Sequence, residues 1–268
     1  MRHESLPARG LDFLQDRVAD MVADIGRIAL LMIDTIRMLG RGLRAPRLIV
    51  DQAHMIGVQS LPLVFIVSLF TGAVAAVQAA YQFSNVVPLK FIGSVILRSV
   101  IIELGPVLTA LIVGGRVGAA IAAELGTMRV TEQVDALEAM AIDPVRYLVV
   151  PRVVAAVIML PILTMLANAV AIFGGYVVAV TSIGVTSHTY VTGLQNFFYM
   201  KDLLSGLIKA FVFGGIISWM GCYHGFRTEG GAEGVGVATT RAVVASCVLV
   251  LISDYVLANV LFRFIFAS

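Results

Sequence analysis

Residues 11–39 show the first regular pattern of the chain, in which apolar residues recur every three or four positions and charged residues fill the gaps. The apolar series is Leu14, Val18, Met21, Ile25, Ile28, Met32, Ile36 and Leu39. This spacing predicts an amphipathic helix with one apolar stripe. Such a helix could pack on the rest of the protein or lie in a membrane interface. Gly40, Gly42 and Pro46 are expected to break it.

From residue 60 the pattern changes to long, almost continuous apolar runs. They cover residues 60–81, 91–123, 149–183, 203–223 and 242–266. About 20 apolar residues cross a hydrocarbon core of ~30 Å, so five spans are expected. The second and third runs are too long for one upright span. We expect a kink at Gly105-Pro106, or an extension out of the membrane beyond Arg116, and bends at Pro161 and Gly174-Gly175. A turn at 82–90 and a polar loop at 186–202 connect the runs.

Composition agrees with a membrane protein. The 268 residues are 59% hydrophobic and 13% charged, whereas soluble domains carry about 25% charged residues. The predicted fold is an all-α integral membrane protein, with an N-terminal interfacial region over residues 1–58 and a five-span domain over residues 59–268. The net charge of +2 does not suggest a nucleic-acid partner. Cys222 and Cys247 lie in apolar stretches and are interpreted as core residues.

The segment from Glu124 to Arg152 is the most polar one after the N-terminus. Val130, Val134, Leu137 and Ala141 share one helical face, which predicts a short helix outside the bilayer over about residues 130–142. Thr131 is expected to cap its start and Asp143-Pro144 to end it. Most of the 19 basic residues lie in the N-terminal region, beside this helix, or in the connection between the fourth and fifth apolar runs. The positive-inside rule therefore places the N-terminus and the polar helix in the cytoplasm and the C-terminus outside.

Motifs of known chemistry are missing from the sequence. It has no HExxH motif and no serine in a GxSxG setting. A Walker A loop needs a lysine after glycine, and Lys90, Lys201 and Lys209 follow Leu, Met and Ile. An enzyme is therefore not expected, nor is a metal site or a cofactor held by this chain. If ATP drives the protein, another chain hydrolyses it.

Two long motifs resemble those of a known family. The stretch GPVLTALIVGGRVGAAIAAELGTMRVTEQVDALEAMAIDPVRYLVVPR, residues 105–152, resembles the signature of the MlaE family of ABC transporter permeases. The run GVGVATTRAVVASCVLVLISDYVL, residues 234–257, resembles its C-terminal signature. The resemblance implies a homodimeric permease in the bacterial inner membrane, paired with two copies of a cytoplasmic ATPase that binds ATP and Mg. It also implies movement of phospholipids to or from a periplasmic MCE-type protein, which maintains outer-membrane lipid asymmetry, and it leaves open a small accessory subunit.

The polar helix has two interpretations. By pattern alone it is an ordinary solvated loop segment, whereas the resemblance implies a coupling helix that docks in a groove of the ATPase. The residues that the resemblance assigns to coupling are Thr131, Glu132, Gln133, Asp135, Ala136, Leu137 and Glu138. A short stiff helix transmits a push better than a flexible loop does.

Charged residues within the spans form a second group of candidates, because each costs about 2.5–3.5 kcal/mol at the bilayer centre. Glu103 either pairs with Lys209 and locks the bundle, or lines a lipid pathway together with it. Arg98 is an imperfectly placed partner, since residues five apart do not share an α-helical face. Asp254 is interpreted as a structural partner. Ile102 stands where relatives often have arginine, which puts an Arg-Glu pair here in doubt.

The first span also supplies candidates, because the resemblance implies that it lines a central cavity. Its predicted substrate-binding stripe is Leu69, Ala73, Val77 and Tyr81, with Gln78 as a hydrogen-bonding group. The alternative for each is a lipid-facing or packing position. Small residues at Gly72, Gly114, Gly118, Gly174 and Gly175 favour close helix packing. Alternative functions are an ATP-independent transporter or channel, a membrane scaffold, or a permease for sterols or other hydrophobic molecules, although the spans show no inverted repeat.

Overall fold

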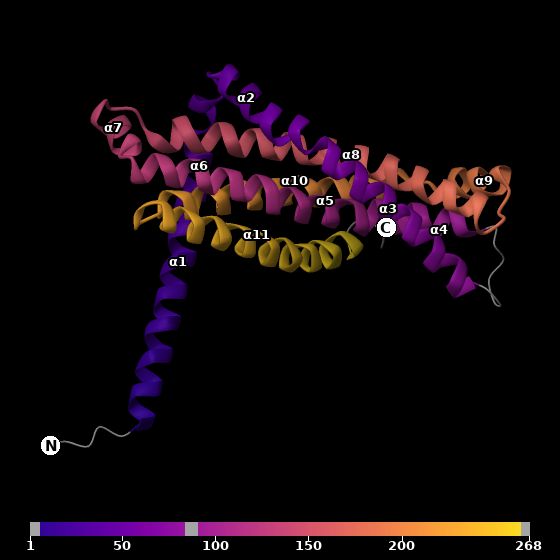
Figure 1. The fold of residues 1–268 in the computed structure, drawn as a ribbon, viewed down its shortest axis with the longest axis horizontal. Coiled ribbons are helices and arrows are strands. Elements are labelled where there is room, and N and C mark those ends of the chain that lie inside the picture. The colour runs from indigo at the N-terminus through magenta and orange to yellow at the C-terminus, as the bar shows by residue number, and fades with distance from the viewer. Residues whose placement is uncertain (1–5, 84–90, 264–268) are drawn as a thin grey trace.

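The computed structural model describes residues 6–83 and 91–263, and within these ranges every regular element is a helix (Figure 1). Five of the helical segments are long and apolar enough to cross a membrane: Pro46–Gln82, Ile92–Val130, Val145–Thr181, Met200–Phe226 and Gly231–Leu261. The predicted all-α integral membrane fold with five spans is thereby confirmed. Most of the predicted turn at 82–90, and the end of the fifth predicted span, lie outside the described residues.

The first span consists of α2 (Pro46–Ile56), a 3₁₀ turn at Val58–Ser60 and α3 (Leu61–Phe83). Pro46 occupies the start of α2, where its missing N–H costs no hydrogen bond. Arg116 of the second span holds the break at the 3₁₀ turn, because its Nη1 donates to the carbonyl of Met55 at 3.2 Å and to Ser60 Oγ at 2.7 Å. The break in the first span is therefore held by hydrogen bonds from the second span.

The second span contains two π-helical turns. Its parts are α4 (Ile92–Ser99), η3 (Val100–Leu104), α5 (Gly105–Val113), η4 (Gly114–Gly118) and α6 (Ala119–Val130). The irregularity expected at Gly105-Pro106 occurs, but as a π turn directly before the proline. Pro106 has no N–H to donate to the preceding turn, and a π turn absorbs such a mismatch by bonding across five residues. The span continues past the predicted end at residue 123 to Val130.

The third span joins η5 (Val145–Val149) to α8 (Val150–Thr181), which runs unbroken through Pro161. The predicted polar loop at 186–202 is wrong, because it contains α9 (Ser187–Phe197). Thr186 caps this helix by accepting a hydrogen bond from the Thr189 N–H. Buried Tyr190 fixes α9 to α8 by donating to the carbonyl of Ile172 at 3.0 Å.

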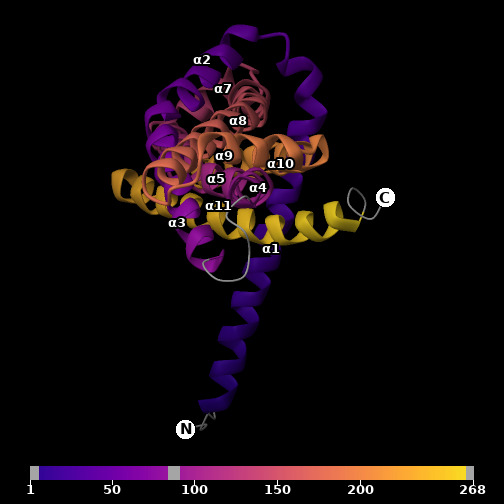
Figure 2. The same cartoon turned by 90° about the vertical axis from the view of Figure 1, so that its right-hand side faces the viewer.

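The fourth and fifth spans are α10 (Met200–Phe226) and α11 (Gly231–Leu261). α11 begins well before the predicted start at residue 242. Its first turns are rich in Gly, Ala and Thr, so their hydropathy is too low to mark a span although they are helical. Figure 2 shows α11 tilted against most of the other spans.

Glycine residues allow the first and third spans to touch through their backbones. A methyl group on Gly72 would lie 1.7 Å from the carbonyl oxygen of Ala171, and one on Gly174 would lie 2.3 Å from that of Leu69. Backbones this close exclude any side chain at these two positions. Gly114 and Gly118 instead make ordinary contacts with Ile217.

The N-terminal helix α1 (Leu6–Gly42) projects away from the bundle. It runs across the direction of the spans, near the end that carries the short helix α7 (Gln133–Ala139), whereas α9 lies at the opposite end (Figure 1). Several of its apolar residues are exposed, among them Val22, Ile25 and Ile36. The predicted amphipathic helix is present, and Gly42 rather than Gly40 marks its end.

Candidate functional site

One buried lysine joins three spans. Lys209 of α10 is fully buried, and its Nζ lies 2.6 Å from Glu103 Oε1 in η3 and 2.9 Å from Asp254 Oδ1 in α11. One lysine facing two carboxylates leaves a negative charge in excess. The Glu103 side chain is 44% exposed and that of Asp254 only 20%. The excess charge is therefore accessible on the Glu103 side of the cluster.

These contacts agree with the alternative in which Glu103 pairs with Lys209 and joins the spans, and with a structural role for Asp254. Each charge alone would be costly at this depth, and mutual pairing offsets that cost only while all partners are present. Contact of these residues with a substrate stays a prediction.

Beside the cluster lies an apolar hollow of about 600 Å³, here named the α4 groove. Its walls are formed by Phe91, Ser94, Val95, Arg98, Ser99, Ile102, Glu103 and Phe197. Arg98 and Glu103, which an ideal α-helix would place on different faces, both line this groove. Glu103 lies within the π turn η3, whose bonding across five residues turns it toward the side of the helix that carries Arg98. The groove thus presents one cationic and one anionic group among apolar side chains.

Arg98 does not form an ion pair with Glu103. Its Nε donates to Asp202 Oδ2 of α10 at 3.0 Å, and its guanidinium lies 5.8 Å from the centre of the Tyr199 ring. Asp202 is buried. Asp202 therefore balances the charge of Arg98 and holds the side chain in place, while the side chain is 45% exposed and lines the groove.

A second apolar hollow of about 430 Å³, the α3 groove, lies on the other side of η3. It is lined by Ile66, Val67, Phe70, Thr71, Val74, Ala75, Gln78 and Leu104. Of the residues predicted on the first span, Gln78 lies in this groove. Leu69 and Ala73 are half-buried, whereas Val77 is exposed and Tyr81 is 83% exposed. The face of α3 that lines the groove is thus different from the predicted stripe of Leu69, Ala73, Val77 and Tyr81.

The short polar helix is present as α7, but with narrower bounds than predicted. Thr131 and Glu132 lie in the turn before it, and Glu132 has a left-handed backbone with φ of 59°. The expectation that Thr131 caps α7 is wrong, because its hydroxyl donates to the carbonyl of Thr127 in α6. Asp143 accepts the N–H groups of Val145 and Arg146. Asp143 therefore caps the start of the next helix, whereas α7 already ends at Ala139.

The residues assigned to coupling are mostly exposed. Glu132, Gln133, Asp135, Ala136 and Glu138 face outward, Leu137 is half-buried, and Val134 is buried beneath them. Asp135 forms an ion pair with Arg129 of α6, which ties α7 to the helix that precedes it. α7 therefore presents an acidic outer face on an apolar base.

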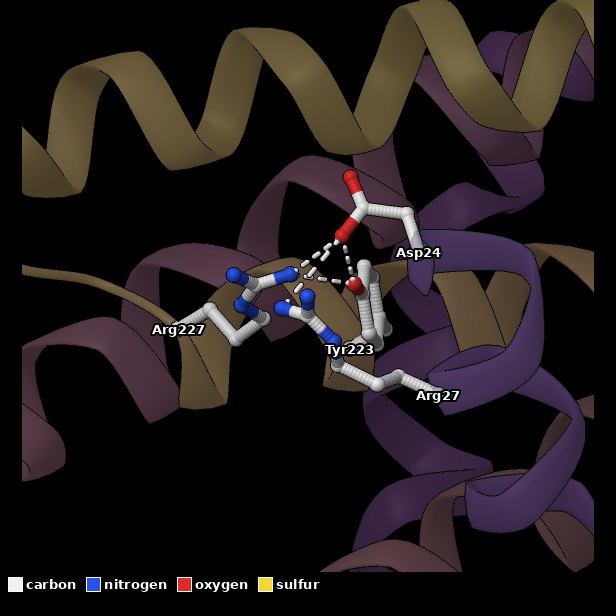
Figure 3. A network of polar contacts seen from close by, with 4 residues as sticks. All are labelled: Asp24, Arg27, Tyr223 and Arg227. Carbon is white, nitrogen blue, oxygen red and sulfur yellow. Dashed lines mark hydrogen bonds and ion pairs between the residues drawn. The ribbon is translucent and has the colours of Figure 1, made fainter. Parts of the chain in front are cut away.

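A polar network joins α1 to the end of α10 (Figure 3). Asp24 Oδ1 accepts hydrogen bonds from the hydroxyl of Tyr223 at 2.8 Å and from Arg227 Nη1 at 2.5 Å, and Arg27 lies 3.6 Å away. The hydrogen bond from Tyr223, followed by Arg227, lowers the pKa of Asp24 below its ordinary value. This network borders a polar hollow of about 770 Å³ between α1, α10 and α11.

Sequence reasoning missed several of these partners. Asp202 and Arg227 flank an apolar run and Asp24 lies within the amphipathic segment; charged residues are common at such positions, and the pattern does not reveal which of them pair. One available signal was the single acidic residue at the start of the fourth run, Asp202. Among residues 6–83 and 91–263, no group of three or more His, Cys, Asp or Glu side chains is arranged to hold a metal ion.

Comparison with known proteins identifies the family. The profile of the family described as Permease MlaE matches residues 49–260. A probable ABC transporter permease protein of Rickettsia bellii is 43% identical over 247 residues, which cover 92% of this chain and 95% of that protein. One of Rickettsia prowazekii is 48% identical over 216 residues, covering 81% and 83%. The intermembrane phospholipid transport system permease protein MlaE of Haemophilus influenzae is 38% identical over 216 residues, covering 80% and 83%. The chain therefore belongs to the MlaE family of ABC transporter permeases, multi-pass proteins of the inner membrane.

Proposed function

We propose that this permease moves phospholipids between the inner membrane and a periplasmic MCE-type lipid-binding protein, and so maintains outer-membrane lipid asymmetry. It works as a homodimer, energised by a cytoplasmic ATPase dimer that binds ATP and Mg. One observation carries the proposal: an apolar groove between the second span and α9, in which Arg98 and Glu103 are both partly exposed. The name of the Haemophilus influenzae relative supports the same substrate.

The chemistry of the α4 groove fits a phospholipid better than a sterol. Arg98 offers a guanidinium, which suits the oxygens of a phosphate. Glu103 carries the excess negative charge of the Lys209 cluster, which suits an ammonium group. A zwitterionic headgroup supplies both partners, whereas a sterol has only a hydroxyl. The apolar walls of the α4 and α3 grooves would hold acyl chains, with Gln78 as a further polar contact.

Energy enters through α7. Its exposed residues from Gln133 to Glu138, with half-buried Leu137, form the surface on which the ATPase docks. α7 is short and continues through tight turns into α6 and η5, so a displacement of the ATPase is passed directly to the second and third spans. The ATPase supplies the nucleotide site that this sequence lacks.

The orientation follows from the basic residues and from α1. The N-terminus and α7 are cytoplasmic, and the C-terminus is periplasmic. α1 lies in the cytoplasmic membrane interface, because its exposed apolar residues run along a helix that crosses the spans (Figure 2). The α4 groove then opens in the periplasmic half of the bundle.

The direct test is the complex purified from its own cells by a tag on this chain and reconstituted in vesicles of phosphatidylethanolamine and phosphatidylglycerol. We expect an ATPase to co-purify, bound phospholipid to be found by mass spectrometry, and labelled phospholipid to be transferred only with ATP. Arg98→Gln and Glu103→Gln should lower the amount of bound phospholipid. Transfer that needs no ATP would favour an ATP-independent transporter, and absence of both lipid and transfer would leave only a scaffold.

A further inference from the structure

An ion pair with one deeply buried partner joins the two helices that lead into and out of α7. Glu124 lies in α6 and Arg152 in the first turn of α8, with Arg152 Nη2 2.8 Å from Glu124 Oε2. The Arg152 side chain is 4% exposed and that of Glu124 is 46% exposed. The chain between them contains the whole of α7. The pair therefore closes a loop that carries α7 at its tip, and Figure 1 shows both α6 and α8 leading toward α7.

Arg152 also holds the segment through which the chain returns to the bundle. Its Nη1 donates to the carbonyl of Leu148 in η5 at 2.7 Å. One side chain thereby fixes α6, η5 and α8 relative to one another. These contacts lie at the ends of the second and third spans that lead to the docking surface.

On its other side α6 is closely packed against the end of α10 and the turn that follows it. A methyl group on Gly225 would lie 2.7 Å from Leu125 Cβ, and one on Gly126 would lie 2.7 Å from Thr228 Oγ1 in that turn. α6 therefore has little freedom to move alone. α8 is packed against α10 as well, since a methyl group on Gly214 would lie 2.6 Å from the carbonyl oxygen of Ala156. The Glu124–Arg152 pair adds a direct contact between α6 and α8.

We infer that Glu124 and Arg152 are positioning residues that convert a displacement of α7 into a joint movement of α6 and α8. The inference rests on the proposed function, in which the ATPase docks on α7. Without the pair, the two helices could slide past each other and absorb the displacement. The pair opposes this sliding, because separating buried Arg152 from its carboxylate would leave an unpaired buried charge.

A purely structural role makes a different prediction. If the pair only stabilised the fold, its loss would reduce the amount of active complex, and ATP hydrolysis and lipid transfer would fall together. If the pair transmits movement, ATP hydrolysis continues while less lipid is transferred per ATP. The number of lipids transferred per ATP therefore separates the two roles.

The first experiment uses the full chain without the ATPase. Spin labels at Thr127→Cys and Arg146→Cys, both exposed sites, report the separation of α6 and η5 by pulsed electron paramagnetic resonance. Cys222 and Cys247 are replaced by alanine. We expect a narrow distance distribution in the parent and a broader one in Glu124→Gln, with Glu124→Asp in between because it keeps the charge. Superimposable distributions in parent and Glu124→Gln would overturn the inference.

The second experiment uses the complex with its ATPase in vesicles. Glu124→Gln should keep ATP hydrolysis near the parent rate while lipid transferred per ATP falls at least about fivefold, the lower end of typical coupling between sites. Asp34→Asn, which removes the exposed pair with Arg37, is the matched control and should leave the ratio unchanged. An unchanged ratio in Glu124→Gln overturns the inference alone, whereas a parent complex without ATP-dependent transfer contradicts the proposed function.

Discussion

The Nζ atom of Lys209 lies 2.6 Å from Glu103 Oε1, so the second and fourth spans are joined by a charge contact inside the bundle. Asp254 adds the fifth span to the same lysine. The stability of such a cluster depends on all of its members, because each charge is tolerated in the apolar bundle only while its partners are present.

Replacement of Lys209 by methionine should therefore destabilise the protein strongly. It leaves two carboxylates facing each other without a cation, and breaking a buried pair in this way costs about 3–5 kcal/mol. Thermal unfolding in detergent measures the loss. The triple variant Lys209→Met, Glu103→Gln, Asp254→Asn should recover much of the stability. Equal stability of the parent and the single variant would contradict a cluster held by charge.

The contact between the first and third spans should not tolerate even one added methyl group. Gly72→Ala places that group 1.7 Å from the Ala171 carbonyl, so α3 and α8 must separate. We expect a loss of stability of about 1–3 kcal/mol, as for other overpacked sites. Gly115→Ala is the matched control, because nothing lies within 4 Å of its added methyl group. Similar melting temperatures for the two variants would argue against the close approach.

The anchor of α1 on α10 should weaken in acid. Hydrogen bonds from Tyr223 and Arg227 lower the folded-state pKa of Asp24 below 3.8. The stabilisation is therefore fully present above the unfolded-state pKa and is lost as pH falls through the folded-state value, below pH ~3.8. Amide hydrogen exchange of α1 should accelerate in that range relative to the intrinsic rate. Asp24→Asn should show faster exchange already at neutral pH, and Asp34→Asn should not.

The outer face of α7 should govern ATPase binding. Leu137→Asp puts a charge on the half-buried contact between α7 and its base, and Glu132→Arg reverses one charge of the acidic face. Both variants should insert normally but lose most of the co-purifying ATPase. Val191→Asp, an exposed position on α9 at the opposite end, is the control. Unchanged ATPase recovery in both α7 variants would exclude α7 as the docking surface.

The spans could be predicted because an apolar run of about 20 residues with almost no charge is typical of a helix that crosses a bilayer. α9 could not, since its packing depends on Tyr190 reaching α8, a contact between segments that no local pattern reveals. The α4 groove was only partly predictable. Arg98 and Glu103 stand out as charges in an apolar run, but an ideal α-helix places them on different faces. Their common groove depends on a π turn, which the sequence marks only through Pro106.

The two π turns η3 and η4 divide the second span into α4, α5 and α6. Each turn sets how the helix before it is rotated about the helix axis relative to the helix after it. Because η3 accommodates one extra residue in its turn, deletion of a single residue such as Ile101 would return it to α-helical winding. Every residue before it would then rotate about the helix axis, and Arg98 would leave the groove while α5 and α6 kept their neighbours. The side chains that line the α4 groove can therefore be reoriented by changes that leave the helices next to α7 undisturbed.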